Sequence, residues 1–340
     1  MKKLTTSDDI YLLMHAPAAS AALGAAITTG LLWMLADRPM SGDEVAQALH
    51  IPGKRGHYWL QYLESFGILD TVPQGYIPSS LARSAILEAR SQDSWAHLVI
   101  DEQEKDACVH GLPQLISHPG SLWAVQGLPE PINYVDRIRL NPERAREFTR
   151  MLFEVHQNLA DRVAELLDLT GVERMMDLGG NSGVVSMALL RKYPALTSTV
   201  VDIANVCLAG RELVAEQGFA HRITFHPAEF AQDEFPTGFD LVLQCDVAEY
   251  SLELLAKLHR SLKPGGRLIY VDHFSPAENL ASPARLEWTF LDSLHDPNFG
   301  YPTLAEVKSR LAQTGFTVSD EHQVIGNGLI LLQAWKGSPS

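Results

Sequence analysis

Asp177-Leu178-Gly179-Gly180-Asn181-Ser182-Gly183 is the most informative run of residues in this chain. It follows a strand-like run at 174–176 and precedes a helix-like run at 184–192. A second strand-like run ends at Asp202, 25 residues after Asp177. A strand, a glycine turn, a helix, a strand and a terminal acid predict a nucleoside-binding βαβ unit. The terminal acid of such a unit can accept hydrogen bonds from both ribose hydroxyls.

The composition of the glycine turn helps to select the ligand. Glycines let the backbone pass close to a bound molecule, and asparagine tolerates left-handed backbone angles. The G-x-G-x-x-G pattern of dinucleotide folds is absent, and Asp177 lies two residues before the first glycine. A carboxylate there suits a cationic amino-acid end better than a pyrophosphate. The turn therefore indicates S-adenosylmethionine, although a glycine-rich turn of any α/β domain is the simpler alternative. The predicted contacts are Asp177, Gly179, Gly180, Gly183 and Asp202.

Length and composition limit the classes of protein to consider. The chain has 340 residues, of which 46% are apolar and 20% charged, as expected for two soluble domains with their own cores. The net charge of -14 argues against nucleic acid as a partner. Cys108, Cys207 and Cys245 show no metal-binding spacing, and the start of the chain lacks the apolar run of a signal peptide. We therefore expect a cytoplasmic protein and assign no metal site.

The run from Tyr11 to Ala36 contains no Asp, Glu, Lys or Arg and is long enough to span a bilayer. It is rich in Ala, Gly, Ser and Thr, and His15 and Pro17 lie within it, so its tendency to insert is weak. We expect a buried pair of helices packed through small residues, with no membrane association.

The first hundred residues are predicted to form short helices followed by a hairpin. Ser41-Gly42-Asp43-Glu44 is a capping box that opens a helix through Leu49, and a second helical run follows Pro52-Gly53. The run 69–77, interrupted by Pro73-Gln74-Gly75, predicts a two-stranded wing. This order is that of a winged helix.

Winged helices often bind DNA through the second helix. Here that helix offers only Lys54, Arg55 and His57 as cations, followed by Tyr58 and Trp59. These are few charges for anchoring phosphates, and the aromatic side chains suit a protein contact. We therefore expect residues 1–95 to form a dimerisation domain.

The rest of the chain is predicted to contain a helical bridge at 96–165 and an α/β domain at 166–340. Short apolar strands are expected at 223–225, 240–243 and 267–271, the last after a turn at Lys263-Pro264-Gly265-Gly266. The runs 317–325 and 329–335 flank Gly326-Asn327-Gly328, which predicts a hairpin. A parallel sheet that ends in an antiparallel hairpin fits a methyltransferase better than a dehydrogenase.

Together these features resemble the plant-type and bacterial small-molecule O-methyltransferases of class I, over nearly the whole chain. The most specific point of likeness is 177–183, with weaker support from 202–206 and 262–266. The resemblance implies a winged-helix dimerisation domain followed by a Rossmann-like domain that binds S-adenosylmethionine. It implies that Glu229 and Phe230 frame the adenine and that Gln244 and Cys245 contact the cofactor. Core packing is an equally good explanation for Phe230 and Cys245.

The catalytic position departs from this family. Its members usually carry a histidine nine residues after the acid that opens the fourth strand, and this histidine takes a proton from the substrate hydroxyl. Counting from Asp240, that place holds Glu249, and because the following segment is shorter than in the family, Tyr250 competes for the role. Glu249 could act as a base, orient a polar hydrogen or stabilise positive charge; a helix-start acid is the simpler reading. Of the family's two supporting acids, Asp272 matches one, and Tyr301 stands at the other.

Two histidines offer another source of a base. His273 follows the fifth strand, and His295 lies in a segment near the place where the family closes over substrate. Surface or hydrogen-bonded loop positions explain both equally well. Upstream, Met151, Phe153 and His156 are candidates for a further wall of the cavity, or for core packing.

The sequence thus predicts a homodimeric enzyme that transfers a methyl group from S-adenosylmethionine to a small aromatic or polycyclic molecule. Oxygen is the favoured acceptor, and Glu249 in place of histidine leaves carbon and nitrogen open. One alternative is a protein of this fold that binds the cofactor but catalyses another reaction, such as hydroxylation or cyclisation. A ligand-sensing winged-helix regulator is a third hypothesis, which the acidic charge disfavours.

Overall fold

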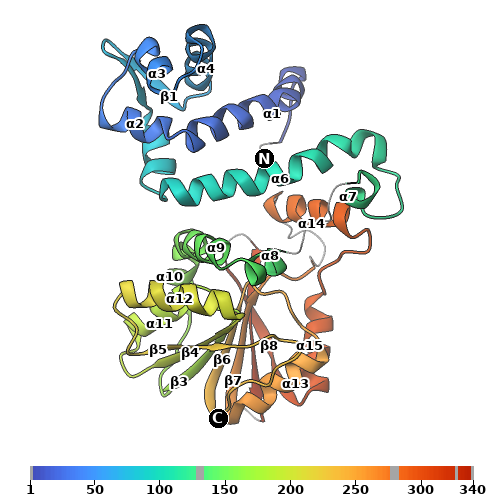
Figure 1. Cartoon of the computed structure of the whole chain (residues 1–340). Coiled ribbons are helices and arrows are strands. Elements are labelled where there is room, and N and C mark those ends of the chain that lie inside the picture. The colour runs from blue at the N-terminus through green and yellow to red at the C-terminus, as the bar shows by residue number, and fades with distance from the viewer. Residues whose placement is uncertain (1–2, 128–133, 276–282, 326–327, 338–340) are drawn as a thin grey trace. The chain divides into compact units, whose positions relative to one another are not determined.

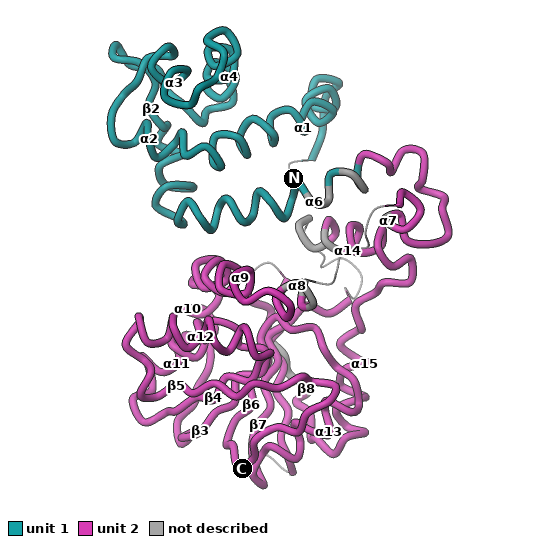
Figure 2. The backbone as a smooth tube through the Cα atoms, in the orientation of Figure 1, with its two compact units in different colours: residues 1–109 teal, residues 110–340 magenta. Residues whose placement is uncertain are grey.

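The computed structural model describes residues 3–127, 134–275, 283–325 and 328–337. The chain forms two compact units, residues 1–109 and 110–340 (Figure 2). Helix α6 (Gln92–Leu115) runs from the first unit into the second.

The first unit is helical with one small hairpin. Its elements are α1 (Ser7–Thr28), α2 (Leu31–Asp37), α3 (Gly42–Ala48), α4 (Gly53–Ser65), β1 (Leu69–Val72), β2 (Gly75–Pro78), α5 (Ser80–Ala82) and the π-helical turn η1 (Arg83–Leu87). The Ser41 hydroxyl accepts from the Glu44 N–H while the Glu44 carboxylate accepts from the Ser41 N–H, so the predicted capping box is present. Strands β1 and β2 pair antiparallel, as the predicted wing requires. Leu31, Leu35, Leu60 and Leu63 are fully buried in the core of this unit.

The prediction of a buried helix pair at 11–36 is correct only for its second half. Helix α2 buries Leu31, Leu32 and Leu35, whereas the long α1 buries only Gly24, Ala26 and Ile27. Leu12 and Met14 of α1 are 69% and 70% exposed. By length and composition, α1 is the single helix among the described residues that qualifies as a candidate membrane span. Small residues made α1 look suited to close packing, but within this chain the first half of α1 packs against little.

The second unit is built around a seven-stranded sheet. Its strands are β3 (Arg174–Leu178), β4 (Thr197–Asp202), β5 (Ile223–Pro227), β6 (Phe239–Cys245), β7 (Leu262–Asp272), β8 (Phe316–Ile325) and β9 (Leu329–Lys336). The spatial order is β5-β4-β3-β6-β7-β9-β8. The first five strands are mutually parallel, and β9 runs antiparallel to both β7 and β8. This confirms a Rossmann-like sheet that ends in an antiparallel hairpin.

Helices cover both faces of the sheet (Figure 1). The helices of this unit are α7 (Leu122–Val125), α8 (Tyr134–Leu140), α9 (Pro142–Val155), α10 (Gln157–Leu166), α11 (Val184–Lys192), α12 (Ala204–Glu216), α13 (Leu252–Ser261), α14 (Pro283–His295) and α15 (Leu304–Gln313). Side chains of α10, α11 and α12 pack on one face, and those of α13 and α15 pack on the other. Burial on both faces explains why the central strands carry continuous apolar runs.

Two predictions near the end of the sheet differ in outcome. The predicted turn at 263–266 lies inside β7, where the pairing with β6 jumps from Leu262 to Arg267 and Gly265 has a φ of 76°. The segment is therefore an irregularity within a strand, because the flanking residues stay paired with β6. The strands of the predicted C-terminal hairpin are present, while Gly326 and Asn327 of its turn lie outside the described residues.

The strand order predicts a crevice beyond the carboxyl ends of the central strands. From β3 the chain continues to β4 on one side, and β6 pairs with β3 on the other. In open α/β sheets, ligands bind beyond the carboxyl ends of the strands at such a reversal of order. The glycine turn follows β3 and the segment of Glu249 follows β6, so both lie at this place.

Candidate functional site

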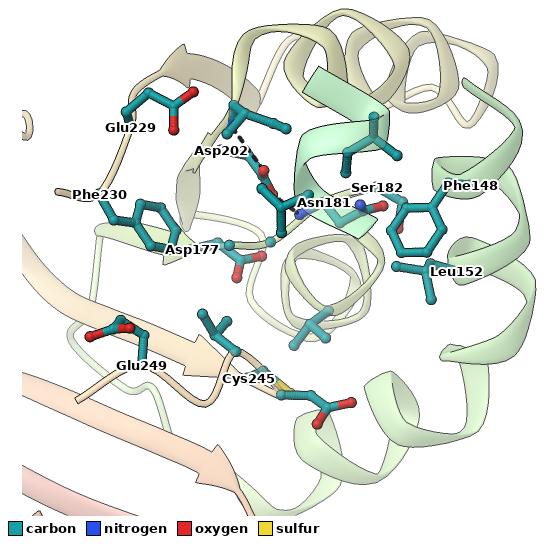
Figure 3. A pocket seen from close by; sticks show the side chains of 18 of the residues that line it. Phe148, Leu152, Asp177, Asn181, Ser182, Asp202, Glu229, Phe230, Cys245 and Glu249 are labelled. Atoms are coloured by element: carbon teal, nitrogen blue, oxygen red, sulfur yellow. Dashed lines mark hydrogen bonds between the residues drawn. The ribbon is translucent and has the colours of Figure 1, made fainter. Parts of the chain in front are cut away.

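A cavity of about 650 Å³ opens at the carboxyl ends of β3, β4, β5 and β6. Helices α8 and α9 supply part of its wall. Eight of the residues predicted to bind the cofactor or to act in catalysis line it: Asp177, Gly179, Gly180, Asp202, Glu229, Phe230, Cys245 and Glu249. Figure 3 labels six of them, all except the two glycines.

The glycines of the turn are required by close packing and backbone angle. Gly179 has a φ of +66°, and a Cβ atom on it would lie 2.7 Å from Cγ2 of Val247. A Cβ atom on Gly180 would lie 2.5 Å from the carboxyl carbon of Asp177. Gly183 has a φ of +73° and is the N-cap residue of α11, but it does not line the cavity. Only glycine meets both demands at 179 without strain.

Asp202 is fixed at the tip of β4 by two backbone groups. Its carboxylate accepts the N–H of Asn181 at 3.0 Å and the N–H of Ile203 at 2.8 Å. The first bond joins the tip of β4 to the glycine turn. Burial raises the pKa of Asp202 to about 6, against the effect of these two hydrogen bonds. The carboxylate is therefore held in one place with capacity for further donors.

Asp177 anchors the start of the same turn. It is 1% exposed and accepts the Ser186 hydroxyl at 2.5 Å, and Ser186 in turn lies 2.8 Å from the Ser198 hydroxyl. Burial raises the pKa of Asp177 to about 6, and the Ser186 hydrogen bonds oppose the rise. A buried carboxylate at the cavity wall favours a cationic group on a ligand.

Two buried polar atoms of the turn lack a hydrogen-bond partner among the described residues. They are Oδ1 of Asn181 and Oγ of Ser182, and both residues line the cavity. A buried polar group without a partner costs free energy, about 1–3 kcal/mol. A polar ligand in the cavity would supply partners, so the residues of this wall fit a ligand with several hydrogen-bonding groups, as S-adenosylmethionine has.

The segment after β5 forms the side of the cavity near Phe230. The Glu229 carboxylate accepts two hydrogen bonds of 2.8 Å each from the guanidinium of Arg139 on α8. The Phe230 ring meets the Phe235 ring edge-on at a centroid distance of 6.0 Å. Figure 3 shows Glu249 on the same side of the cavity as Phe230, with Phe148 and Leu152 on the far side.

The loop after β6 has strained backbone angles. Asp246 and Ala248 have φ values of 57° and 56°, a region that alanine rarely adopts. The Ala248 N–H donates to Asp272 at 2.8 Å, and Nε2 of Gln244 donates to the Glu249 carbonyl at 2.8 Å. Such strain persists when surrounding contacts enforce it, and it often marks functional segments.

One carboxylate oxygen of Glu249 accepts a backbone hydrogen bond. Its Oε1 accepts the N–H of Ser251, the N-cap residue of α13, at 3.0 Å. The other carboxylate oxygen is not fixed by this bond. Glu249 is the only one of the four predicted catalytic residues that lines the cavity.

The other predicted residues lie elsewhere in the unit. Gln244 is fully buried, and its side chain supports the loop. Tyr250 is 3% exposed and packs against the rings of Tyr270 and Phe274. The His273 N–H donates to Asp272 at 2.7 Å, and burial raises the pKa of this carboxyl.

The remaining predicted base is on a different element. His295 ends α14, away from the lining of the cavity. In the same region the Tyr301 hydroxyl donates to Asp292 at 3.4 Å. The described residues contain no group of three or more His, Cys, Asp or Glu side chains placed to hold a metal ion.

His156 lines the cavity, whereas the two other candidates for its wall on the bridging helix do not. Met151 is buried, and Phe153 packs on the core of the sheet. Nε2 of His156 lies 3.7 Å from Oδ2 of Asp246, which also lines the cavity. The sequence signal for His156 was its place in the predicted helical bridge; nothing in the sequence indicated Asp246 as its neighbour.

Comparison with known proteins agrees with this geometry. Residues 124–295, which are 172 of the 340 residues, match the sequence profile of the O-methyltransferase domain. The chain is 30% identical over 237 residues to a 3-hydroxy-5-methyl-1-naphthoate 3-O-methyltransferase of Streptomyces sahachiroi, covering 65% of this chain and 62% of that protein. It is 25% identical to the N,N-dimethyltransferase OxyT of Streptomyces rimosus, covering 91% of each chain.

A solved structure shows the same fold. Human N-acetylserotonin methyltransferase, in complex with S-adenosylmethionine, superposes with a TM-score of 0.79 at 19% identity, covering 99% of this chain and all of that one. The profile match spans α9, the glycine turn, Asp202 and the loop after β6, which are the parts that build the cavity. The chain therefore belongs to the S-adenosylmethionine-dependent O-methyltransferase family.

Proposed function

We propose that this protein transfers the methyl group of S-adenosylmethionine to an oxygen atom of a small aromatic or polycyclic molecule. The observation that carries the proposal is one cavity with two different walls. One wall holds buried carboxylates and polar atoms that have no partner among the described residues, and the other, from α8 and α9, is mostly apolar. This division suits a charged cofactor beside a flat apolar acceptor.

The polar wall would hold the cofactor. Asp202 has lone pairs for ribose hydroxyls, Asp177 suits the ammonium end, and Asn181 and Ser182 have polar atoms without described partners. Phe230 offers a ring face for adenine, and Glu229 offers a carboxylate that Arg139 now engages. When bound, S-adenosylmethionine supplies an electrophilic methyl carbon on a sulfonium. The protein holds the two reactants in line, and positioning of this kind can lower a barrier by several kcal/mol, about 7–11 at most.

The apolar wall would hold the acceptor. Phe148 and Leu152 project from α9 into the cavity (Figure 3). Val135, Ile138 and Leu159 add to this surface. Aromatic rings pack well on such side chains. The naphthoate substrate named for the Streptomyces sahachiroi relative supports an aromatic acceptor, and the name of OxyT keeps nitrogen open as the acceptor atom.

We further propose that residues 1–95, within the first unit, form a winged-helix dimerisation domain, and that the protein is a cytoplasmic homodimer. Residues 96–165 would form the helical bridge that lines the acceptor side. The exposed apolar side chains of α1, among them Ile10, Tyr11, Leu12 and Met14, support a contact with a second copy. Sedimentation of the purified protein tests this proposal, which a monomer at micromolar concentration would contradict.

The function is tested by incubating the protein with methyl-labelled S-adenosylmethionine and a panel of hydroxylated naphthalenes. Label in the product, attached to oxygen, is the expected result. Conversion of the acceptor without label would instead support a reaction such as hydroxylation or cyclisation on the same fold. Asp202→Ala should abolish cofactor binding measured by calorimetry, and unchanged affinity would overturn the cofactor assignment.

A further inference from the structure

His156 and Asp246 form a pair of ionisable groups in the cavity wall, apart from the glycine turn. His156 lies between α9 and α10, and Asp246 is the first residue after β6. Nε2 of the imidazole is 3.7 Å from Oδ2 of the carboxylate. Both residues line the cavity. The pair therefore has access to a molecule bound there.

The backbone conformation at Asp246 fixes its place in this pair. Its φ of 57° is left-handed, which aspartate tolerates better than most residues, and its N–H donates to the Val271 carbonyl at 2.8 Å. His156 is held by the helix junction, because its N–H donates to Leu152 and its carbonyl accepts from Ala160. Hydrogen bonds therefore fix the backbone at both residues of the pair.

The protonation states favour proton uptake. Burial lowers the pKa of His156, and Asp246 acts in the opposite direction. At neutral pH the ring is therefore neutral and has a lone pair to accept a proton. At 3.7 Å the separation exceeds hydrogen-bond length, so a neutral ring is not tied to the carboxylate. A protonated ring would form an ion pair with it.

We propose that His156 is the general base of this protein and that Asp246 is a positioning residue that stabilises the protonated ring. The inference rests on the proposed function and deepens it. The acceptor it implies carries an acidic hydroxyl, such as a phenol or naphthol, with its ring against Phe148 and Leu152. Histidine can deprotonate such a hydroxyl more readily than an unperturbed carboxylate can.

The proposed step transfers one proton and one methyl group. The acceptor O–H proton moves to the imidazole of His156, and the oxygen forms a bond to the transferred methyl carbon. The carbon–sulfur bond breaks, and its electron pair stays on sulfur, which loses its positive charge. The resulting imidazolium faces the Asp246 carboxylate and returns its proton to water after the product leaves.

The first test measures turnover at saturating cofactor and acceptor. His156→Gln should lower kcat by about 100-fold or more, because general bases contribute about 10²–10⁴-fold, while cofactor affinity stays unchanged. The matched control is His221→Gln, an exposed histidine outside the cavity, which should behave as wild type. Turnover in His156→Gln within twofold of wild type would overturn the proposal.

The role of Asp246 has a separate readout. Because Asp246 raises the pKa of His156, Asp246→Asn should move the acid limb of the kcat–pH profile to lower pH. Saturating cofactor is needed, since Asp177, Asp202, Glu229, Glu249, Glu253 and Arg139 also line the cavity. An unmoved acid limb would show that Asp246 acts only on structure.

The second test needs no methyl transfer. With S-adenosylhomocysteine present, 4-nitrophenol is added and its ionisation is followed by absorbance. A larger phenolate fraction on wild type than on His156→Gln supports the proposal even if no panel acceptor is methylated, which separates it from failure of the proposed function. Equal ionisation on the two proteins, or no binding of 4-nitrophenol, would contradict it.

Discussion

Lys257 holds the Phe230 segment in place: its Nζ atom donates to the Phe230 carbonyl at 2.9 Å and to the Ala231 carbonyl at 3.1 Å. Lys257 is 4% exposed, and its ammonium also lies 3.8 Å from Glu253. Phe230 and Ala231 both line the cavity. A buried cation from α13 therefore sets the shape of one wall of the proposed cofactor site.

Removing this cation should loosen that wall. In Lys257→Met the two carbonyls lose a charged donor, and such hydrogen bonds contribute about 1.5–3 kcal/mol each to stability. We expect the dissociation constant for S-adenosylmethionine, measured by calorimetry, to rise by about tenfold, or about 1.4 kcal/mol. Lys54→Met, an exposed lysine in the first unit, is the control. Equal affinities in the two variants would argue against a role for Lys257 at the site.

The close contact at Gly179 can be tested separately from the effect of its backbone angle. Gly179 and Gly218 both have positive φ values, +66° and +79°, but only a Cβ atom on Gly179 would meet a neighbour, Val247 at 2.7 Å. Gly218→Ala should cost only the left-handed strain, about 1–2 kcal/mol of stability, and leave cofactor binding unchanged. Gly179→Ala should add the steric contact and weaken cofactor binding about tenfold or more. Similar cofactor affinities for both variants would contradict the close approach.

Cofactor affinity should depend on pH near 6. The pKa values of Asp177 and Asp202 are both raised to about 6 by burial, so protons bind these carboxyls as pH falls below that value. A protonated acid attracts an ammonium group less and offers fewer acceptor sites to hydroxyls. We expect the dissociation constant for S-adenosylmethionine to rise between pH 7.5 and pH 5, and to rise less steeply in Asp202→Asn.

The same two carboxyls also make the stability of the protein depend on pH. Here the direction is opposite to that of cofactor affinity, because their contribution to stability is larger at low pH. A folded-state pKa of about 6, above the ordinary aspartate value of 3.8, favours the protonated form in the folded state. Their contribution is fully stabilising below pH 3.8 and is lost as pH rises through about 6. Asp177→Asn should therefore stabilise the cofactor-free protein at pH 7.5 relative to wild type, more than at pH 5. Chemical denaturation at the two pH values measures this difference, and a pH-independent change would contradict it.

Two ion pairs join α9 to α12. Arg146 pairs with Glu212, and Arg150 pairs with Glu216, one turn further along each helix. Exposed ion pairs contribute little to stability, so Glu212→Gln combined with Glu216→Gln should lower the free energy of unfolding only slightly in low salt. The loss should shrink in high salt, because salt screens exposed charges. Glu165→Gln, which breaks only a pair within α10, should have a smaller effect.

The parts of the fold encoded by local sequence patterns were predictable. The glycine turn, helix α11 and the acid at Asp202 follow from residue types at fixed spacing. The capping box at Ser41 and the C-terminal hairpin are also local signals. Helix α1 was less predictable, because small apolar residues suit burial and exposure toward a partner alike, and composition cannot tell the two apart.

The site residues that directly follow a strand were predictable from the sequence. Those farther along the loops or on the helices were less predictable. After β6, positive φ values at Asp246 and Ala248 change the direction of the side chains, so counting from Asp240 cannot say which residue faces the cavity. The contact between His156 and Asp246 joins segments far apart in the sequence, and only the folded sheet and its helices bring them together. Spacing along one segment carries no information about such a contact.

The proposed role of the cavity beyond β3 and β6 is to bring an aromatic hydroxyl to the methyl group of S-adenosylmethionine. Its most direct test is mass spectrometry and NMR of hydroxynaphthalenes incubated with the protein and S-adenosylmethionine carrying a ¹³C-methyl group. We expect a product whose labelled carbon is bonded to oxygen, and we expect its formation to be lost in Asp202→Ala. A label bonded to carbon or nitrogen would contradict the acceptor assignment, and product without label would contradict methyl transfer itself.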